Sequence, residues 1–147
     1  MNIRDVMTSN PLTVSPSDTI QNAARIMRDE DTGAVPVVEN GRPVGMVTDR
    51  DIVVRAVANG ELSRPVREVV SGSLITADPD MSTREAAELM SEHQIRRLPV
   101  VENDRLVGIV SLGDTVRGLL VITSRIFMGC LLSTYVGRVL RPGGSRI

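Results

Sequence analysis

Aromatic side chains are almost absent from this sequence, which holds one Phe, one Tyr and no Trp among its 147 residues. The two that exist, Phe127 and Tyr135, lie near the C-terminal end. Proteins that bind single-stranded nucleic acid stack the bases on aromatic rings, and residues 1–126 offer no such ring. The core must therefore consist of aliphatic residues, and we interpret the methionines as part of it: Met7, Met27, Met46, Met81 and Met90.

Cysteine and histidine occur once each in the repeats and tail, as Cys130 and His93. A single cysteine excludes an intramolecular disulfide and is typical of a reducing compartment, and residues 2–5 do not resemble a signal peptide. We therefore expect a cytoplasmic protein. One His and one Cys assemble neither a zinc site nor a Cys–His nucleophile, so we expect no metal and no enzymatic activity. We place His93 at the surface, near a helix end.

Neither sign of charge dominates, because 17 basic and 18 acidic residues leave a formal charge of −1. This balance excludes a global attraction to nucleic acid or to an anionic membrane. A long apolar run occurs only in the tail, where Arg125 is the single charged residue between Arg117 and Arg138. About twenty residues can span a bilayer, but an arginine near mid-span disfavours a membrane anchor. We expect a helix packed on the repeats or on a second subunit; a disordered or non-native extension is the third alternative.

What the sequence does contain is an internal repeat. With an offset of 63 residues, residues 3–57 align with residues 66–120 without a gap, and the block Pro-Val-Val-Glu-Asn at 36–40 recurs at 99–103. Units this short cannot each bury a face alone, so the two should pack together as one domain with function at the seam. The predicted boundaries are 2–60 for repeat one, 65–120 for repeat two and 121–147 for the tail.

Hydrophobic periodicity and turn signals predict one element order for both repeats: strand, helix, strand, strand, helix. In repeat one we expect these elements at 12–14, about 20–29, 34–38, 44–47 and 49–58. In repeat two we expect them at 74–76, 83–92, 98–101, 106–110 and from about 113. Asn40-Gly41 predicts a hairpin turn and Asn59-Gly60 a helix C-cap. The predicted fold class is α/β, with tandem units packed as a pseudo-two-fold module.

A seven-residue motif recurs where each hairpin should end. Residues 45–51 read Gly, apolar, Val, hydroxyl, two variable residues and Asp, and residues 108–114 read the same. One interpretation is a capping box, in which Thr or Ser caps a helix and an acidic residue three positions later caps in return. The other is a ribose site, because a carboxylate beside a helix N-terminus can accept hydrogen bonds from two adjacent hydroxyl groups. The motif alone leaves both open.

The duplicated motif and the apolar-Pro-Val-Val segment before it, at 35–51 and 98–114, resemble the CBS domain, a repeat named after cystathionine β-synthase. The resemblance covers about residues 2–120 and is most like small stand-alone bacterial CBS pairs. It implies a regulatory module without a catalytic domain, which binds AMP, ADP or ATP between the repeats and signals by a conformational shift, as in energy sensing. S-adenosylmethionine and NAD are less favoured ligands. It also implies a homodimer and an unidentified protein partner.

The resemblance implies two sets of ligand-binding residues. In the first site Thr48 and Asp51 hold ribose and Arg50 adds a cation, while base and phosphates are framed by Ser73, Leu74, Ile75, Arg97 and Leu98. In the second site Ser111 and Asp114 hold ribose, framed by Pro11, Leu12, Thr13, Ala34 and Val35. Arg96-Arg97 has the uncharged Gly33-Ala34 as its counterpart, which makes the first site the better phosphate binder. The competing interpretation of these arginines is a solvated face or intersubunit salt bridges.

The alternative function belongs to another class: a ligand-free dimeric stress or interaction protein that works through protein contacts. It is favoured by the missing aromatic partner for adenine, by the uncharged Ala34 and by the apolar tail. Asp51 and Asp114 would then be helix caps and nothing more.

Overall fold

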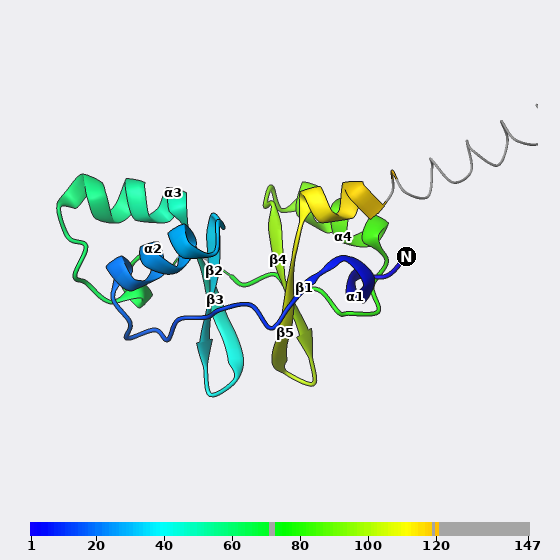
Figure 1. Ribbon diagram of the computed structural model, residues 1–147, viewed down its shortest axis with the longest axis horizontal. Helices are drawn as coiled ribbons and strands as arrows, with labels where there is room; N and C mark the ends of the chain where they lie inside the picture. The colour runs from blue at the N-terminus through cyan, green and yellow to red at the C-terminus, as the bar shows by residue number, and fades with distance from the viewer. Residues whose placement is uncertain (71–72, 119, 121–147) are drawn as a thin grey trace, which may run out of the picture.

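Two similar halves lie side by side in the computed structural model, which describes residues 1–70, 73–118 and 120 (Figure 1). The first half holds α2 (Ile20–Asp29), β2 (Ala34–Glu39), β3 (Arg42–Thr48) and α3 (Asp49–Asp51), which continues through the π-helical turn η1 (Ile52–Ala56) and the 3₁₀ turn η2 (Val57–Asn59). The second half holds α4 (Thr83–Glu92), β4 (Arg97–Glu102), β5 (Arg105–Ser111) and a helix at 112–118. The predicted α/β class and the tandem arrangement are confirmed.

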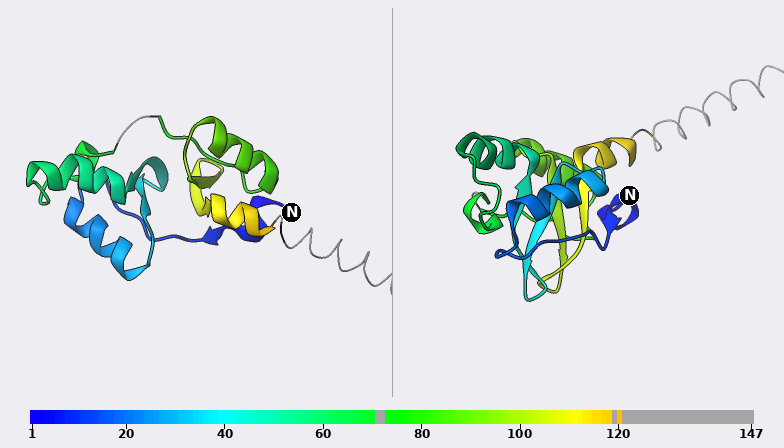
Figure 2. Two further views of the ribbon diagram at one scale, coloured as in Figure 1. Left: turned by 90° about the horizontal axis from the view of Figure 1, so that it is seen from above. Right: turned by 60° about the vertical axis from the view of Figure 1, so that its left-hand side comes forward.

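The helices of both halves lie at one end of the hairpins, whose turns project away from them (Figures 1 and 2). In the described parts of the chain, no helix is both long enough and apolar enough to cross a bilayer. The tail at 121–147, for which we expected a packed helix, lies outside the described residues.

Each half is built on an antiparallel hairpin, β2–β3 in the first and β4–β5 in the second. Two residues with positive φ form each turn: Asn40 (52°) with Gly41 (79°), and Asn103 (51°) with Asp104 (62°). Such turns match the right-handed twist of the strands that they join, so short hairpins favour them. The hairpin turn predicted at Asn40-Gly41 is confirmed.

The strands predicted at 12–14 and 74–76 are wrong: the first segment makes only one parallel bridge to the neighbouring hairpin, at Val14, and in the second half the corresponding bridge falls on Ala77, just after the predicted segment. Val14 donates its N–H to the carbonyl oxygen of Pro36 (3.0 Å). A longer ladder would need hydrogen bonds from the N–H groups of residues 16 and 36. Both residues are prolines, which have no N–H. The second half repeats the bridge and the interrupting prolines through Ala77, Pro79 and Pro99.

Side-chain caps start the two long helices. Thr19 Oγ1 accepts a hydrogen bond from the N–H of Asn22 (3.1 Å) at α2, and Ser82 and Glu85 form a capping box at α4. The hydroxyl and the N–H of Ser82 both donate to the Glu85 carboxylate, which lowers the pKa of Glu85. Gly60, in the left-handed region (φ 72°), ends the helical stretch that began at α3, as the sequence predicted.

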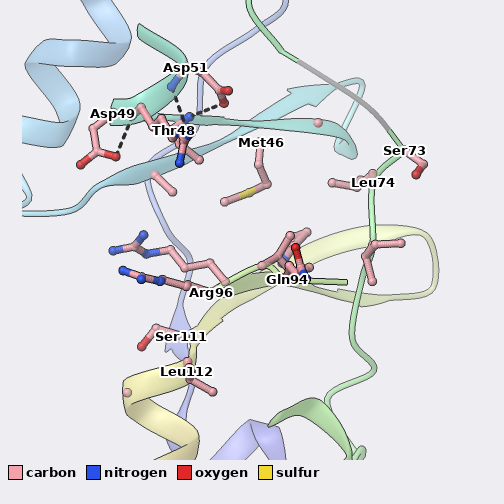
Figure 3. A pocket seen from close by; sticks show the side chains of 18 of the residues that line it. Met46, Thr48, Asp49, Asp51, Ser73, Leu74, Gln94, Arg96, Ser111 and Leu112 are labelled. Carbon is pink, nitrogen blue, oxygen red and sulfur yellow. Dashed lines mark hydrogen bonds between the residues drawn. The ribbon is translucent and has the colours of Figure 1, made fainter. Parts of the chain in front are cut away.

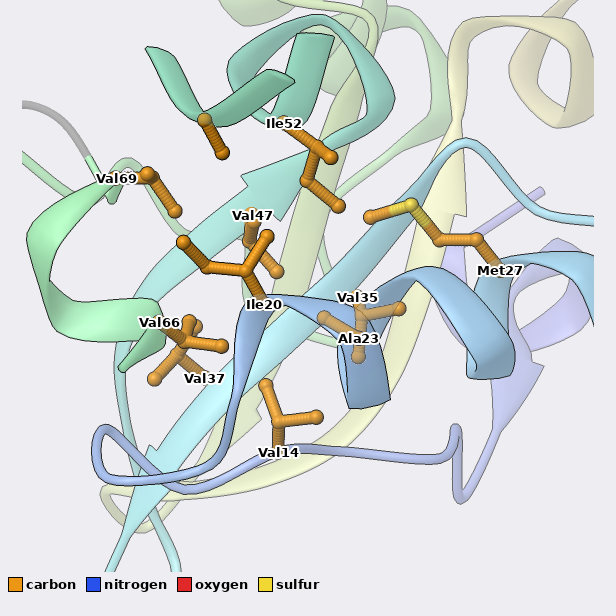
Figure 4. Packing of buried hydrophobic residues seen from close by; sticks show 11 residues of the cluster. Val14, Ile20, Ala23, Met27, Val35, Val37, Val47, Ile52, Val66 and Val69 are labelled. Carbon is orange, nitrogen blue, oxygen red and sulfur yellow. The ribbon is translucent and has the colours of Figure 1, made fainter. Parts of the chain in front are cut away.

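The two cores exchange their leading helical turns. Val66 and Val69, in and after η3 (Val66–Glu68), begin repeat two but are buried in the first core (Figure 4). Ile3 of α1 (Ile3–Val6) begins repeat one but is fully buried in the second core. Each core therefore contains a turn from the other repeat. The first core comprises Val14, Ile20, Ala23, Met27, Val35, Val37, Val47, Ile52, Ala56, Val66 and Val69, and the second Ile3, Ala77, Ala86, Met90, Leu98, Val100 and Val110.

This exchange explains the glycine that opens each motif. A Cβ at Gly45 would overlap a methyl group of Val70, and a Cβ at Gly108 would overlap the sulfur of Met7. Both neighbours belong to the exchanged segments, so the glycines let those segments approach the strands. Next to Met7, β1 (Thr8–Ser9) pairs with β5 and completes the three-stranded sheet β1–β5–β4.

Candidate functional site

A cleft of about 1170 Å³ opens at the seam between the halves (Figure 3). We call it the large cleft. Its walls come from the end of β3 and the start of α3, from the start of β4, from residues 111–113 and from residues 73–75. It therefore gathers segments of both repeats. The first-site residues predicted from the sequence that line it are Thr48, Arg50, Asp51, Ser73, Leu74, Ile75 and Arg97.

Both motif aspartates form the capping box that the motif allowed. The N–H of Thr48 donates to Asp51 Oδ2 (3.1 Å), and the N–H of Asp51 donates to Thr48 Oγ1 (3.1 Å). In the second half, the N–H and hydroxyl of Ser111 donate to Asp114 Oδ2 (2.9 and 2.7 Å), and the N–H of Asp114 donates to Ser111 Oγ (3.2 Å).

These caps occupy one oxygen of each carboxylate. Among the described residues, no hydrogen bond reaches Oδ1 of Asp51 or of Asp114. A carboxylate offers about four acceptor positions, so the same side chain can cap a helix with Oδ2 and bind a ligand hydroxyl with Oδ1. Capping and ribose binding are therefore compatible functions of one residue.

Three guanidinium groups, those of Arg50, Arg96 and Arg97, line the large cleft together with the carboxylates of Asp49 and Asp51. None of the three arginines forms an ion pair with another described residue. The cleft thus carries one more positive than negative group, and its cations are available to an anionic ligand.

Part of the remaining wall of the large cleft is aliphatic. Leu74, Ile75 and Met46 of β3 line it, and Figure 3 shows Leu74 and Met46 near each other. Our interpretation of Met46 as a core residue is wrong: its side chain is partly exposed and lines the cleft, because Gly45 and Val47 take the buried face of the strand. The period-two alternation of a strand could have identified Met46.

A second cleft of about 260 Å³, which we call the small cleft, contains the other motif aspartate. Of the predicted second-site residues it brings together Ser111, Asp114 and Leu12. Its charged lining consists of the carboxylates of Glu30, Asp31 and Asp114 and the guanidinium of Arg97.

Five predicted site residues lie elsewhere than expected. Ala34, which we assigned to the second site, lines the large cleft instead. Pro11 and Thr13 line neither cleft. Val35 and Leu98 are buried in the two cores and line neither cleft.

Sequence reasoning missed the loops that precede β2 and β4. Asp31 and Thr32 line the small cleft, and their repeat counterparts Gln94 and Ile95 line the large one. The two loops have the same backbone conformation at one repeat position, where Asp31 (φ 49°) and Gln94 (φ 53°) both have positive φ. The 63-residue offset alone would have paired these loops, but nothing in their composition marks them as site residues.

Known proteins share this architecture. A family model described as the CBS domain matches residues 3–57 and 66–121. The CBS domain-containing protein YhcV of Bacillus subtilis is 51% identical over 113 residues, which make up 76% of this chain and 81% of that protein. The relative therefore has little chain outside the matched pair.

Solved structures of CBS proteins superpose on the chain, two of them with adenosine ligands. The domain pair of MJ0100 in complex with 5′-methylthioadenosine and S-adenosyl-L-methionine gives a TM-score of 0.71 at 30% identity, over 88% of this chain and 97% of that one. CBSX2 in complex with AMP gives 0.72 at 26% identity, over 83% and 98%.

A third structure, Hypoxic Response Protein I with two coordinated zinc ions, gives a TM-score of 0.73 at 37% identity, over 80% of this chain and 98% of that one. In the part of this chain that the structure describes, no group of three His, Cys, Asp or Glu residues could hold a metal ion. The double family match and the relative that is half identical lead to one conclusion: the chain belongs to the CBS-domain family and carries a tandem pair of CBS domains.

Proposed function

We propose that the protein is a regulatory module that binds an adenine nucleotide, AMP, ADP or ATP, in the large cleft. The observation that carries this proposal is the composition of that cleft. A carboxylate oxygen and three guanidinium groups that have no hydrogen-bonded or ion-paired partner among the described residues face the same space as aliphatic side chains of the opposite repeat. These are the groups that ribose, phosphate and a nucleobase each need.

Each part of the nucleotide has a proposed partner. Asp51 Oδ1 accepts hydrogen bonds from the two ribose hydroxyls, with Thr48 beside it. Arg50 and Arg97 pair with the phosphates, because charge-assisted hydrogen bonds to phosphate are the strongest that a side chain forms. The base lies against Leu74 and Ile75, where backbone groups select its edge without any aromatic ring.

The solved relatives support the ligand class. The structures of CBSX2 and MJ0100 hold AMP, 5′-methylthioadenosine and S-adenosyl-L-methionine, and all three contain an adenosine group. The excess of positive groups in the large cleft favours a phosphate-bearing ligand over the cationic S-adenosylmethionine. NAD ranks below the mononucleotides because it carries a second nucleoside, and the groups assigned in the large cleft account for only one.

The mechanism we propose is a population shift without chemistry. A ligand that contacts Asp51 in one half and Arg97 in the other stabilises one relative angle of the halves, and a protein partner reads the difference. Such a ligand shifts the equilibrium only by its differential affinity for the two states, and coupling of about 1–3 kcal/mol is typical.

We also propose that the protein acts as a homodimer in the cytoplasm. Val53, Val54 and Val57 lie on adjoining turns and are 58%, 58% and 52% exposed, as is Val116, the repeat counterpart of Val53, at 45%. A row of exposed aliphatic residues on both halves fits a self-complementary interface. Light scattering coupled to size-exclusion chromatography should give twice the monomer mass, and a monomer that persists at high concentration would contradict this part of the proposal.

The test of the ligand class is thermal melting with AMP, ADP, ATP, NAD, S-adenosylmethionine and guanine nucleotides. Tyr135 and Phe127 are the only aromatic residues, so melting should be followed by circular dichroism. A ligand at 100 times its Kd stabilises the native state by about 2.7 kcal/mol, a clear rise in Tm. We expect that rise with adenine nucleotides alone. Equal melting with every compound would leave the interaction-protein alternative standing.

The matched control is a capping box outside both clefts. Glu85→Ala removes the acidic partner of the α4 cap, as Asp51→Ala removes that of the α3 cap. Both variants should melt earlier without ligand, because each loses a cap. Only Asp51→Ala should also reduce the rise in Tm that is measured at a nucleotide concentration just sufficient to saturate the large cleft of the wild type.

A further inference from the structure

Arg97 lines both clefts, and among the described residues it is the one basic side chain of the small cleft. Its guanidinium reaches from β4 to the first half, where Nη2 lies 3.4 Å from the position that a Cβ of Gly33 would occupy. Gly33 stands between Thr32, which lines the small cleft, and Ala34, which lines the large one. The guanidinium therefore lies at the partition between the clefts.

The small cleft depends more strongly than the large cleft on the guanidinium of Arg97. The large cleft also has Arg50 and Arg96. In the small cleft, Arg97 faces the carboxylates of Glu30, Asp31 and Asp114. If its guanidinium turned to a phosphate on the other side of Gly33, the small cleft would keep carboxylates only and would repel an anion.

The repeat counterpart of Arg97 is Ala34, so the first half supplies no second cation at the equivalent place. Within the described residues, no ion pair holds Arg97 on either side. One guanidinium can form a bidentate pair with one phosphate at a time.

We propose that the two clefts share Arg97, so that a phosphate-bearing nucleotide in the large cleft takes this group from the small cleft and prevents tight binding of a second one. The chain then binds one such nucleotide tightly, although its fold supplies two ribose sites. This proposal rests on the proposed function and adds a rule for how the two sites interact.

The test is calorimetric titration of the full chain with ADP. We expect one ADP per chain in the wild type, with any second binding event at least about tenfold weaker. Asp51→Ala disables the large cleft and leaves Arg97 to the small cleft, so this variant should bind one ADP there. The double variant Asp51→Ala/Asp114→Ala should bind none.

The role of Arg97 is isolated in the Asp51→Ala background. Adding Arg97→Gln should weaken the remaining ADP binding by about tenfold or more, the usual effect of losing a hydrogen bond between charged groups. Adding Arg25→Gln removes an equal charge beside Ile26, which lines the small cleft, and should change the affinity by less than about twofold. Circular dichroism of each variant checks that it is folded.

Two results would overturn the proposal while leaving the nucleotide function intact. One is wild-type binding of two ADP molecules with similar affinity, and the other is small-cleft binding that Arg97→Gln does not weaken. Absence of ADP binding in the wild type would refute the proposed function, and with it this inference.

Discussion

The two clefts are built from one repeated motif and differ in almost every charge around it. Asp51 and Asp114 make the same cap, with the same oxygen, at the same repeat position. The large cleft adds three arginines, whereas the small cleft adds two acidic residues and only the shared Arg97. The two repeats keep the same backbone and the same caps, whereas the residues at and just before the start of β2 and β4 make the charges of the two clefts unequal.

In this tandem repeat, positions that agree between the halves and positions that differ have different roles. Positions that agree between the halves, such as Gly45 with Gly108, are explained by packing of the exchanged segments. Positions that disagree, such as Ala34 with Arg97, are those that distinguish one cleft from the other. A residue shared by both repeats is thus not by itself evidence of two equal sites.

The largest expected effect on stability comes from a substitution at Ile3, the residue that repeat one contributes to the second core. Ile3 is fully buried in the second core, so Ile3→Ala should lower the free energy of unfolding by about 2–5 kcal/mol. Hydrogen exchange should show that β4 and β5 lose protection before β2 and β3, although Ile3 belongs to repeat one. Val44→Ala, at a residue that is 46% exposed, is the control and should cost about 0.5 kcal/mol or less. Loss of protection confined to the first half would contradict the exchange.

The next effect separates the two motif aspartates by affinity. Asp51→Ala should weaken the tightest AMP binding by about tenfold or more, because Asp51 is the ribose group of the cationic cleft. Asp114→Ala should leave that affinity within about twofold of the wild type. Calorimetric titration of both variants measures the difference. The opposite order would place the better nucleotide site in the small cleft.

The smallest expected effect is a loss of stability that should be equal for the two motif aspartates. Because each aspartate accepts a hydrogen bond from the N–H of the capping residue three positions before it, Asp51→Ala and Asp114→Ala should each lower stability in the absence of ligand by about 1 kcal/mol. Chemical denaturation of the two variants checks this equality. A loss of stability in only one of them would show that the caps are not equivalent.

Much of this arrangement follows from local sequence signals. Asn40-Gly41 specifies its own turn, because these residues tolerate positive φ. The cap at Thr48 and Asp51 is one of the two interpretations that their spacing allowed. The wrong strand at 12–14 could also have been avoided from the sequence. Pro16 and Pro36 lack the N–H groups that a longer strand there would require.

The exchange and the shared cleft could not be predicted in this way. Nothing in the local sequence indicates in which of two similar cores Ile3 and Val66 are buried. Likewise, nothing in the sequence tells that Glu30, at the end of α2, approaches Asp114, which follows β5. These are long-range facts that depend on how the halves meet, whereas the signals read from the sequence are local.

A crystal structure of the chain grown with AMP would show whether the ribose of an adenine nucleotide binds Asp51 in the large cleft. We expect AMP between Asp51 and residues 73–75, with its phosphate facing Arg97. A nucleotide whose ribose lies on other residues would contradict this expectation, and so would a large cleft left empty at saturating AMP.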